Sequence, residues 1–121
     1  MEEQLIGFET AVLAKEKGFK LGSGWQIRSL YNLKDGEIFC EKTRETSDYA
    51  CERCTQSLLQ RWLREVHGVY ISPMFIGPHT NKHQYRIDIK ESGNLGEYST
   101  WYDTHEQALE AGLYKGLTLI K

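Results

Sequence analysis

The segment that most constrains this chain is residues 55–68, TQSLLQRWLREVHG, which has the pattern of one amphipathic helix. Its apolar side chains recur at three- and four-residue spacing, and its charged ones fall on the opposite side. The apolar stripe consists of Leu58, Leu59, Trp62, Leu63 and Val66. Thr55 is a favoured N-cap residue, and Gly68 stands where a left-handed residue would end the helix. Because so broad a stripe must be buried, we predict a globular domain built around this helix.

Length and composition are those of one small domain. A chain of 121 residues has single-domain size, and a net charge of −2 gives no strong field for nucleic acid or an anionic membrane. No apolar run approaches the roughly 20 residues that span a bilayer, so we expect no membrane association. The first residues, MEEQ, lack the regions of a signal peptide, and three cysteines suit reduced thiols. We therefore expect a cytoplasmic protein that folds as a single α+β domain over residues 1–121.

Before the central helix, the sequence predicts one helix, one hairpin and one loop. Residues 8–17 have helical periodicity and end at a glycine. Residues 25–33 and 37–41 flank an Asp-Gly pair, which favours a tight turn between antiparallel strands. Cys40 alternates with an isoleucine in the second strand, so we predict that it is a small buried hydrophobe. Residues 42–53 are polar and irregular, and we predict an exposed loop there.

After the central helix, the pattern changes to strands and then returns to helix. The predicted strands are residues 69–76, 84–91 and 97–102. Pro73 falls within the first of them, which suits an edge strand or a bulge. A capping box, THEQ, opens a last helix over residues 104–120, where Gly112 and Gly116 allow close approach to another element. The predicted fold class is α+β, in the order α-ββ-α-βββ-α, with about three helices packed on a small antiparallel sheet.

Two pairs of residues have the spacing of a zinc site. Cys51 and Cys54 form a CxxC motif, and His79 and His83 have three residues between them. The 24 residues between the pairs contain a helix and a strand, so the pairs meet only if the fold returns the histidine turn to the start of the central helix. Alternatively, the cysteines are incidental loop residues, or a redox dithiol before a helix N-terminus. We expect neither a metal nor a cofactor.

No grouping of residues predicts catalysis. The histidines fall at predicted helix ends and turns, no serine lies in a GxSxG context, and no glycine-rich phosphate loop is present. Alternation along the strands also places neighbouring carboxylates on opposite faces. We therefore expect no catalytic residue, and a protein that is not an enzyme.

The order helix, three strands, helix over residues 55–120 resembles the double-stranded-RNA-binding domain in outline. That resemblance implies phosphate contacts by a basic cluster at the start of the last helix, where this chain instead has His105, Glu106 and Gln107. The candidate nucleic-acid contacts that remain are Arg61, Arg64, Lys82 and Arg86. A solvated charged surface is the alternative interpretation of the same residues.

Aromatic residues are numerous for a chain of this length, and packing explains most of them. In the predicted strand 97–102, Tyr98 and Tyr102 would share one face and Trp101 the other. At least one of these sets must then be partly exposed, which indicates an interaction surface formed by Tyr98, Trp101 and Tyr102.

A family resemblance is carried by three segments together: residues 8–19 (FETAVLAKEKGF), 55–68 and 102–120 (YDTHEQALEAGLYKGLTLI). They resemble small uncharacterised proteins encoded by phages and prophages of gut Bacteroidetes. The resemblance implies an intracellular setting and a mobile-element origin, and it supplies no activity.

The leading hypothesis from sequence is therefore a non-enzymatic accessory protein that binds another macromolecule, either a protein partner or a second copy of itself. The alternatives are a weak nucleic-acid-binding domain and a small domain stapled by zinc.

Overall fold

The computed structural model describes residues 4–20, 24–77, 79–90 and 97–120. Its elements are α1 (Phe8–Glu16), β1 (Gln26–Asn32), β2 (Ile38–Thr43), β3 (Ala50–Glu52), α2 (Gln56–His67), β4 (Val69–Phe75), β5 (His83–Ile89), β6 (Glu97–Tyr98) and α3 (His105–Leu119). The α+β class and the predicted order are confirmed. Within the described ranges, no helix has the length and apolar character needed to cross a bilayer.

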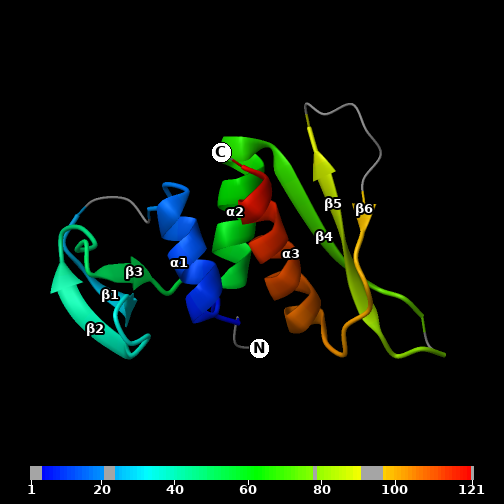
Figure 1. Ribbon diagram of the computed structural model, residues 1–121, viewed down its shortest axis with the longest axis horizontal. Helices are drawn as coiled ribbons and strands as arrows, with labels where there is room; N and C mark the ends of the chain where they lie inside the picture. Colours follow the sequence, from blue (N-terminus) through cyan, green and yellow to red (C-terminus); the bar gives the residue numbers. More distant parts are fainter. Residues whose placement is uncertain (1–3, 21–23, 78, 91–96, 121) are drawn as a thin grey trace.

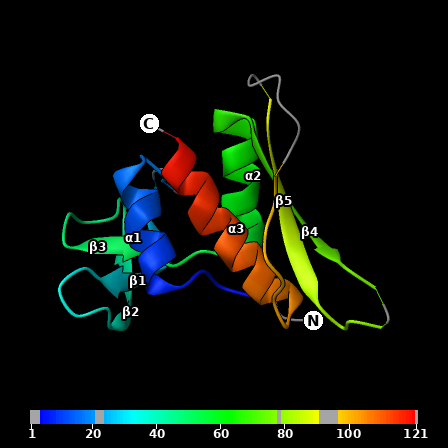
Figure 2. The same cartoon turned by 45° about the vertical axis from the view of Figure 1, so that its right-hand side comes forward.

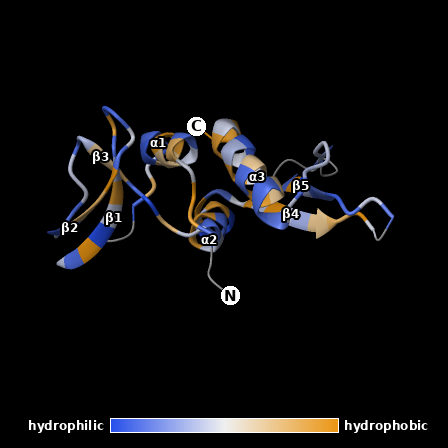
Figure 3. Cartoon of the chain, turned by 90° about the horizontal axis from the view of Figure 1, so that it is seen from below, coloured by the Kyte–Doolittle hydropathy of each residue, from blue (hydrophilic) through white to orange (hydrophobic). Residues whose placement is uncertain are grey.

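The strands form two antiparallel sheets of three strands each, in the orders β2-β1-β3 and β4-β5-β6. The helices lie between the sheets: α1 packs against the first sheet, and α2 and α3 cover one face of the second (Figures 1 and 2). The view from below shows the same cluster of helices between the β1–β2 and β4–β5 strands (Figure 3). The strands thus divide between two sheets, where the sequence suggested one.

The prediction of an exposed loop over residues 42–53 is wrong at both ends, because β2 continues to Thr43 and a further strand follows. Strand β3 occupies Ala50–Glu52, and all three of its residues are buried. It pairs with β1, so that Leu30 lies opposite Glu52 and Tyr31 opposite Cys51. Local polarity misled the prediction because Glu52 is buried as an ion pair with Arg28.

Helix α2 begins and ends where the sequence predicted. The Thr55 hydroxyl accepts a hydrogen bond from the Leu58 N–H at 3.2 Å, and Gly68 ends the helix with φ of 66°. Leu59 and Leu63 are fully buried, whereas Leu58 and Val66 are 38% and 60% exposed. The buried stripe is therefore narrower than the apolar stripe in the sequence.

Helix α3 packs directly on β4 and β5, and its glycines make this possible. A Cβ at Gly112 would lie 2.6 Å from Ile71 Cγ2, and a Cβ at Gly116 would lie 3.0 Å from Ile71 Cδ1. The predicted role of the two glycines in close approach is confirmed. Pro73 lies in β4, which is an edge strand, as its sequence indicated.

Removing the N-cap of α3 is expected to lower stability. The Thr104 hydroxyl accepts a hydrogen bond from the Gln107 N–H at 3.1 Å, and the Gln107 amide oxygen accepts one from the Asp103 N–H at 3.1 Å. Thr104→Ala should reduce the free energy of unfolding by about 1 kcal/mol, measured by urea denaturation. Thr104→Ser retains the acceptor and is the matched control. Equal losses in both variants would show that the cap contributes nothing.

Candidate functional site

The sheet β4-β5-β6 has one buried face and one face that no described helix covers. Val69, Ile71 and Ile87 are buried against the helices. Because side chains alternate along a strand, the residues between them point away from the helices. We call this the outer sheet face; it consists of Tyr70, Ser72, Met74, Gln84, Arg86, Asp88 and Tyr98. Figures 1 and 2 show α2 and α3 on one side of the sheet only.

Arg86 is held at the centre of the outer sheet face by its neighbours. Its Nε lies 3.0 Å from Asp88 Oδ2, and its Nη1 donates to Tyr98 Oη at 3.2 Å. The guanidinium carbon also lies 5.5 Å from the centre of the Tyr98 ring. The hydrogen bond to Asp88, followed by that to Tyr98, raises the pKa of Arg86 above its ordinary value. The result is a permanently cationic group held against the exposed ring of Tyr98, on the face that also carries the exposed Tyr70, opposite Asp88.

The interaction residues predicted in the last strand do not share faces as expected. Arg86 pairs with Tyr98, but the next bridge joins His83 to Tyr102, so one extra residue is present on the β6 side. Such a bulge moves all following side chains to the opposite face. Tyr98 is therefore 57% exposed on the outer sheet face, whereas Tyr102 is half-buried and stacks on Tyr85 with ring centres 6.3 Å apart.

Trp101, the third predicted interaction residue, is 58% exposed beside this bulge. It and Tyr98 are the two members of the predicted set that remain available for contact. Burial raises the pKa of Tyr85, the partner of Tyr102, above its ordinary value, with smaller contributions from Tyr102 and Glu97. Tyr102 thus belongs to the packing between the sheet and α3.

The predicted basic residues do not form one patch. Arg61 and Arg64 are exposed on α2, on the helical side of the sheet, whereas Arg86 lies on the outer sheet face. Three of these cations also have carboxylate partners, in the pairs Arg61–Glu65, Lys82–Asp103 and Arg86–Asp88. The hydrogen bond from Lys82 lowers the pKa of Asp103 below its ordinary value. Each pair reduces the positive charge available to a phosphate backbone.

The predicted zinc pairs lie on different sides of the molecule. Cys51 and Cys54 are buried in and after β3, while His79 and His83 lie at the β4–β5 hairpin beyond the helices (Figure 1). Across the described residues, no group of three or more histidine, cysteine or acidic side chains is placed to hold a metal ion. Burial raises the pKa of both thiols, that of Cys54 to about 12, so neither is activated as a redox thiolate.

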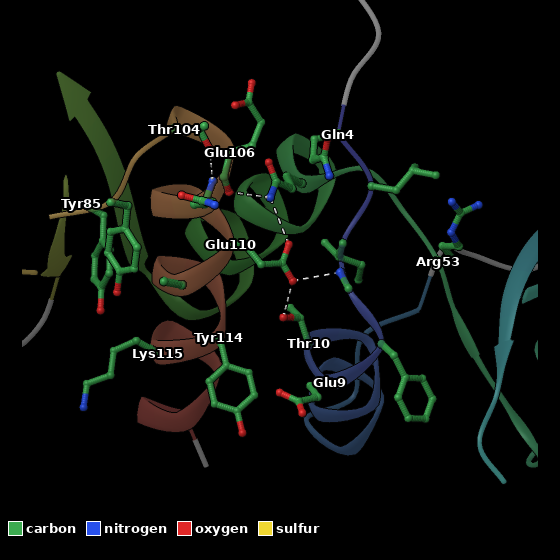
Figure 4. A pocket seen from close by; sticks show the side chains of 18 of the residues that line it. Gln4, Glu9, Thr10, Arg53, Tyr85, Thr104, Glu106, Glu110, Tyr114 and Lys115 are labelled. Atoms are coloured by element: carbon green, nitrogen blue, oxygen red, sulfur yellow. Dashed lines mark hydrogen bonds between the residues drawn. The ribbon is translucent and has the colours of Figure 1, made fainter. Parts of the chain in front are cut away.

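A broad open groove of about 1720 Å³ runs between the N-terminal segment, α1 and α3 (Figure 4). Its polar centre is Glu110, whose Oε2 accepts hydrogen bonds from the Gly7 N–H and the Thr10 hydroxyl. Its Oε1 accepts one from the Gln56 amide at 3.0 Å. A carboxylate at the start of α1 also interacts favourably with the helix dipole. Glu110 therefore joins α1, α2 and α3, and its acceptor oxygens are engaged in holding the fold.

The sequence did not reveal a second exposed apolar surface, on strands β1 and β2. Ile27 and Ile38 are 74% and 55% exposed, and Trp25, just before β1, is 71% exposed. Cys40 lies on the same face and is exposed, so the prediction that it is buried is wrong. Alternation correctly groups Cys40 with Ile38, on the sheet face that also carries Tyr31, but the burial of Tyr31 against Phe8 of α1 does not extend across that face to β2. Phe39 and Glu41 are half-buried on the opposite face of the sheet, with Leu30 and Arg28.

Comparison with known proteins finds no matching family model, no matching curated protein and no matching solved structure.

Proposed function

We propose that this protein is a non-enzymatic binding module that contacts another protein through the outer sheet face. One observation carries the proposal: the sheet β4-β5-β6 is covered by helices on one face, and on the other it presents the exposed Tyr98 bonded to Arg86, with the exposed Tyr70 on the neighbouring strand β4. Tyrosine and arginine are the residues most often found at energetically important positions of protein interfaces.

The geometry of Arg86 supports this role. Its guanidinium is already oriented by Asp88 and Tyr98, so binding costs little additional side-chain entropy. Trp101 extends the same surface beyond the bulge with a large, rigid ring. A partner would therefore meet a preorganised, mixed aromatic and polar surface in place of a flexible one.

We further propose that the protein acts in the cytoplasm as an accessory protein of a phage or prophage. The supporting observation is the resemblance of residues 8–19, 55–68 and 102–120, which fall largely on α1, α2 and α3. The proposal that the protein is not an enzyme is supported by the contacts of Glu110, the carboxylate at the centre of the open groove. Both of its oxygens accept hydrogen bonds within the fold, from Gly7, Thr10 and Gln56.

Substitution of the outer sheet face should abolish partner capture. In affinity purification from a lysate of the infected or lysogenic host, Tyr98→Ala with Trp101→Ala should reduce recovery of the specific partner by more than tenfold, since interface aromatics often contribute at least 2 kcal/mol. Tyr49→Ala removes a tyrosine that is 52% exposed beside the other sheet, and it should leave recovery unchanged. Full recovery with the double variant would refute the proposed surface.

Nucleic-acid binding is the second candidate, because the α2-β4-β5-β6-α3 order is that of the double-stranded-RNA-binding domain in outline. It is less favoured because Lys82 and Arg86 are each paired with a carboxylate. Binding to duplex RNA that weakens steeply with added salt, and further on Arg86→Ala, would favour this function over protein binding.

A further inference from the structure

The open edges of the two sheets differ in how well they are protected from pairing with another strand. At the β4 edge, Pro73 has no N–H to donate, and the register places its nitrogen on the side away from β5. The next carbonyl along that edge, that of Ile71, accepts a hydrogen bond from the Gln60 amide at 2.6 Å. The β4 edge is therefore blocked twice.

The β3 edge and the β6 edge are also poor templates. At β3, the ammonium group of Lys15 donates to the carbonyl of Ala50 and, at 2.8 Å, to that of Ser47. This places α1 across the edge of β3. Strand β6 contains only Glu97 and Tyr98, which is too short to align a partner strand.

Strand β2 has none of these protections in the described structure. It is six residues long, contains no proline, and pairs only with β1. The Asn32 N–H donates to the Glu37 carbonyl, and hydrogen-bonded pairs alternate along an antiparallel ladder. Phe39 and Glu41 therefore direct their backbone groups to β1. The N–H and C=O groups of Ile38, Cys40 and Lys42 point to the open edge.

We propose that two copies of this chain pair antiparallel through their β2 edges, with Cys40 opposite Cys40 of the second copy on the two-fold axis. In this register Ile38 lies opposite Lys42 of the second copy, and Phe39 lies opposite Glu41. The backbone groups at the open edge then bond to one another, and the two sheets join into one of six strands. Such an interface is isologous and closes on itself.

Charge selects this register over its neighbours. The alternation of free backbone groups allows a shift only in steps of two residues. A shift by two residues in one direction places Glu41 directly opposite Glu41 of the second copy. A shift by two in the other direction places Glu41 opposite Glu37 of the second copy. Both shifted registers therefore place like charges opposite one another. Only the register centred on Cys40 pairs the whole strand without such repulsion. It also withdraws the exposed side chains of Ile38 and Cys40 from water.

The chain itself provides the reporter. Cys51 and Cys54 are buried with raised thiol pKa values, whereas Cys40 is exposed. The native protein should sediment at twice its 14.0 kDa chain mass. Mild oxidation with diamide, which accepts the two electrons and two protons released, should cross-link it through Cys40. Cα atoms of a directly opposed pair lie about 5.5 Å apart, within disulfide range.

Three variants distinguish this register from random collision. Cys40→Ser should remain a dimer that diamide does not cross-link. Ile38→Cys in the Cys40→Ser background should also fail to cross-link, because the two introduced cysteines would be about 13 Å apart, four residues along the strand. Cys40→Pro removes an edge donor without removing a bond to β1, and should weaken dimerisation at least tenfold.

A native chain that sediments as a monomer overturns the proposal. So does a Cys40→Pro protein that keeps its circular dichroism spectrum and still dimerises with native affinity. Cross-linking of the Ile38→Cys variant as fast as the native chain would show that the register is wrong. If Cys40→Pro fails to fold, sedimentation of the native chain and diamide cross-linking of the two cysteine variants still test the proposed dimer. The β2 edge lies on the other sheet from Tyr98 and Trp101, so this result is independent of the proposed partner surface.

Discussion

Replacing Glu52 by glutamine is expected to lower the free energy of unfolding by about 3–5 kcal/mol, because it leaves the Arg28 charge buried without a counter-charge. Arg28 Nη1 lies 3.1 Å from Glu52 Oε1, and the two side chains are 1% and 5% exposed. The Thr46 hydroxyl donates to the same carboxylate at 2.6 Å, and Arg28 donates to the Arg44 carbonyl at 3.0 Å. These bonds hold the β2–β3 connection over the sheet.

Urea denaturation monitored by circular dichroism measures the effect. Glu65→Gln is the matched control, because the Arg61–Glu65 pair has similar chemistry and is 65% and 55% exposed. Its loss should be only about 0.3–0.5 kcal/mol. Replacing both buried charges at once, with Arg28→Met and Glu52→Leu, should cost much less than Glu52→Gln alone. Equal losses for Glu52→Gln and Glu65→Gln would contradict the importance of burial.

The helices could be predicted from the sequence because their signals are local. Thr55, Gly68 and Thr104 act within one turn of their own position, and each is used as predicted. Gly112 is a local signal of the same kind, because a glycine in a helix allows another element to pack closely against it. These features depend on residues three or four positions apart.

The faces of the strands could not be predicted in the same way. Cys40 and Ile38 share a face with Tyr31, which is buried against Phe8 of α1, yet both are exposed, and alternation alone cannot show how far across the sheet that burial extends. One extra residue before Tyr102 turns it away from the face of Tyr98, and nothing in the local sequence indicates the bulge. Glu52 is polar and buried because of Arg28, 24 positions away.

The candidate site was predicted in part. Tyr98 and Trp101 are exposed, as the surplus of aromatic residues indicated, but Arg86 does not lie with the other predicted basic residues. The sequence grouped Arg86 with Arg61 and Arg64 by charge alone. The structure separates them, and it links Arg86 to Asp88 and Tyr98 on one sheet face. Charge composition identifies cations, but only the strand register shows which of them share a surface.

Gly112→Val is expected to lower the free energy of unfolding by about 3 kcal/mol, because the added side chain would overlap β4 and β5. Even a Cβ would lie 2.6 Å from Ile71 Cγ2 and 3.0 Å from Tyr85 Cγ, and Ile71 is only 3% exposed. Either α3 must move away from the sheet or the sheet must bend, and both also disturb the outer sheet face. Urea denaturation with an unchanged slope would report the loss directly.

Two variants on the same helix separate the effect of steric overlap with the sheet from the effect of helix propensity. Ala111→Val changes propensity at the neighbouring, half-buried position and should cost about 0.6 kcal/mol. A Cβ at Gly116 would lie 3.0 Å from Ile71 Cδ1, 3.4 Å from Val69 Cγ1 and 3.5 Å from Leu63 Cδ1. These are ends of side chains that can move, and alanine has a higher helix propensity than glycine, so Gly116→Ala should cost much less than Gly112→Val. A loss for Gly112→Val no larger than that for Ala111→Val would mean that α3 and the sheet are not in close contact. Gly112→Val is expected to cost the most because the Cβ position of Gly112 comes closest to the sheet, 2.6 Å from Ile71 Cγ2.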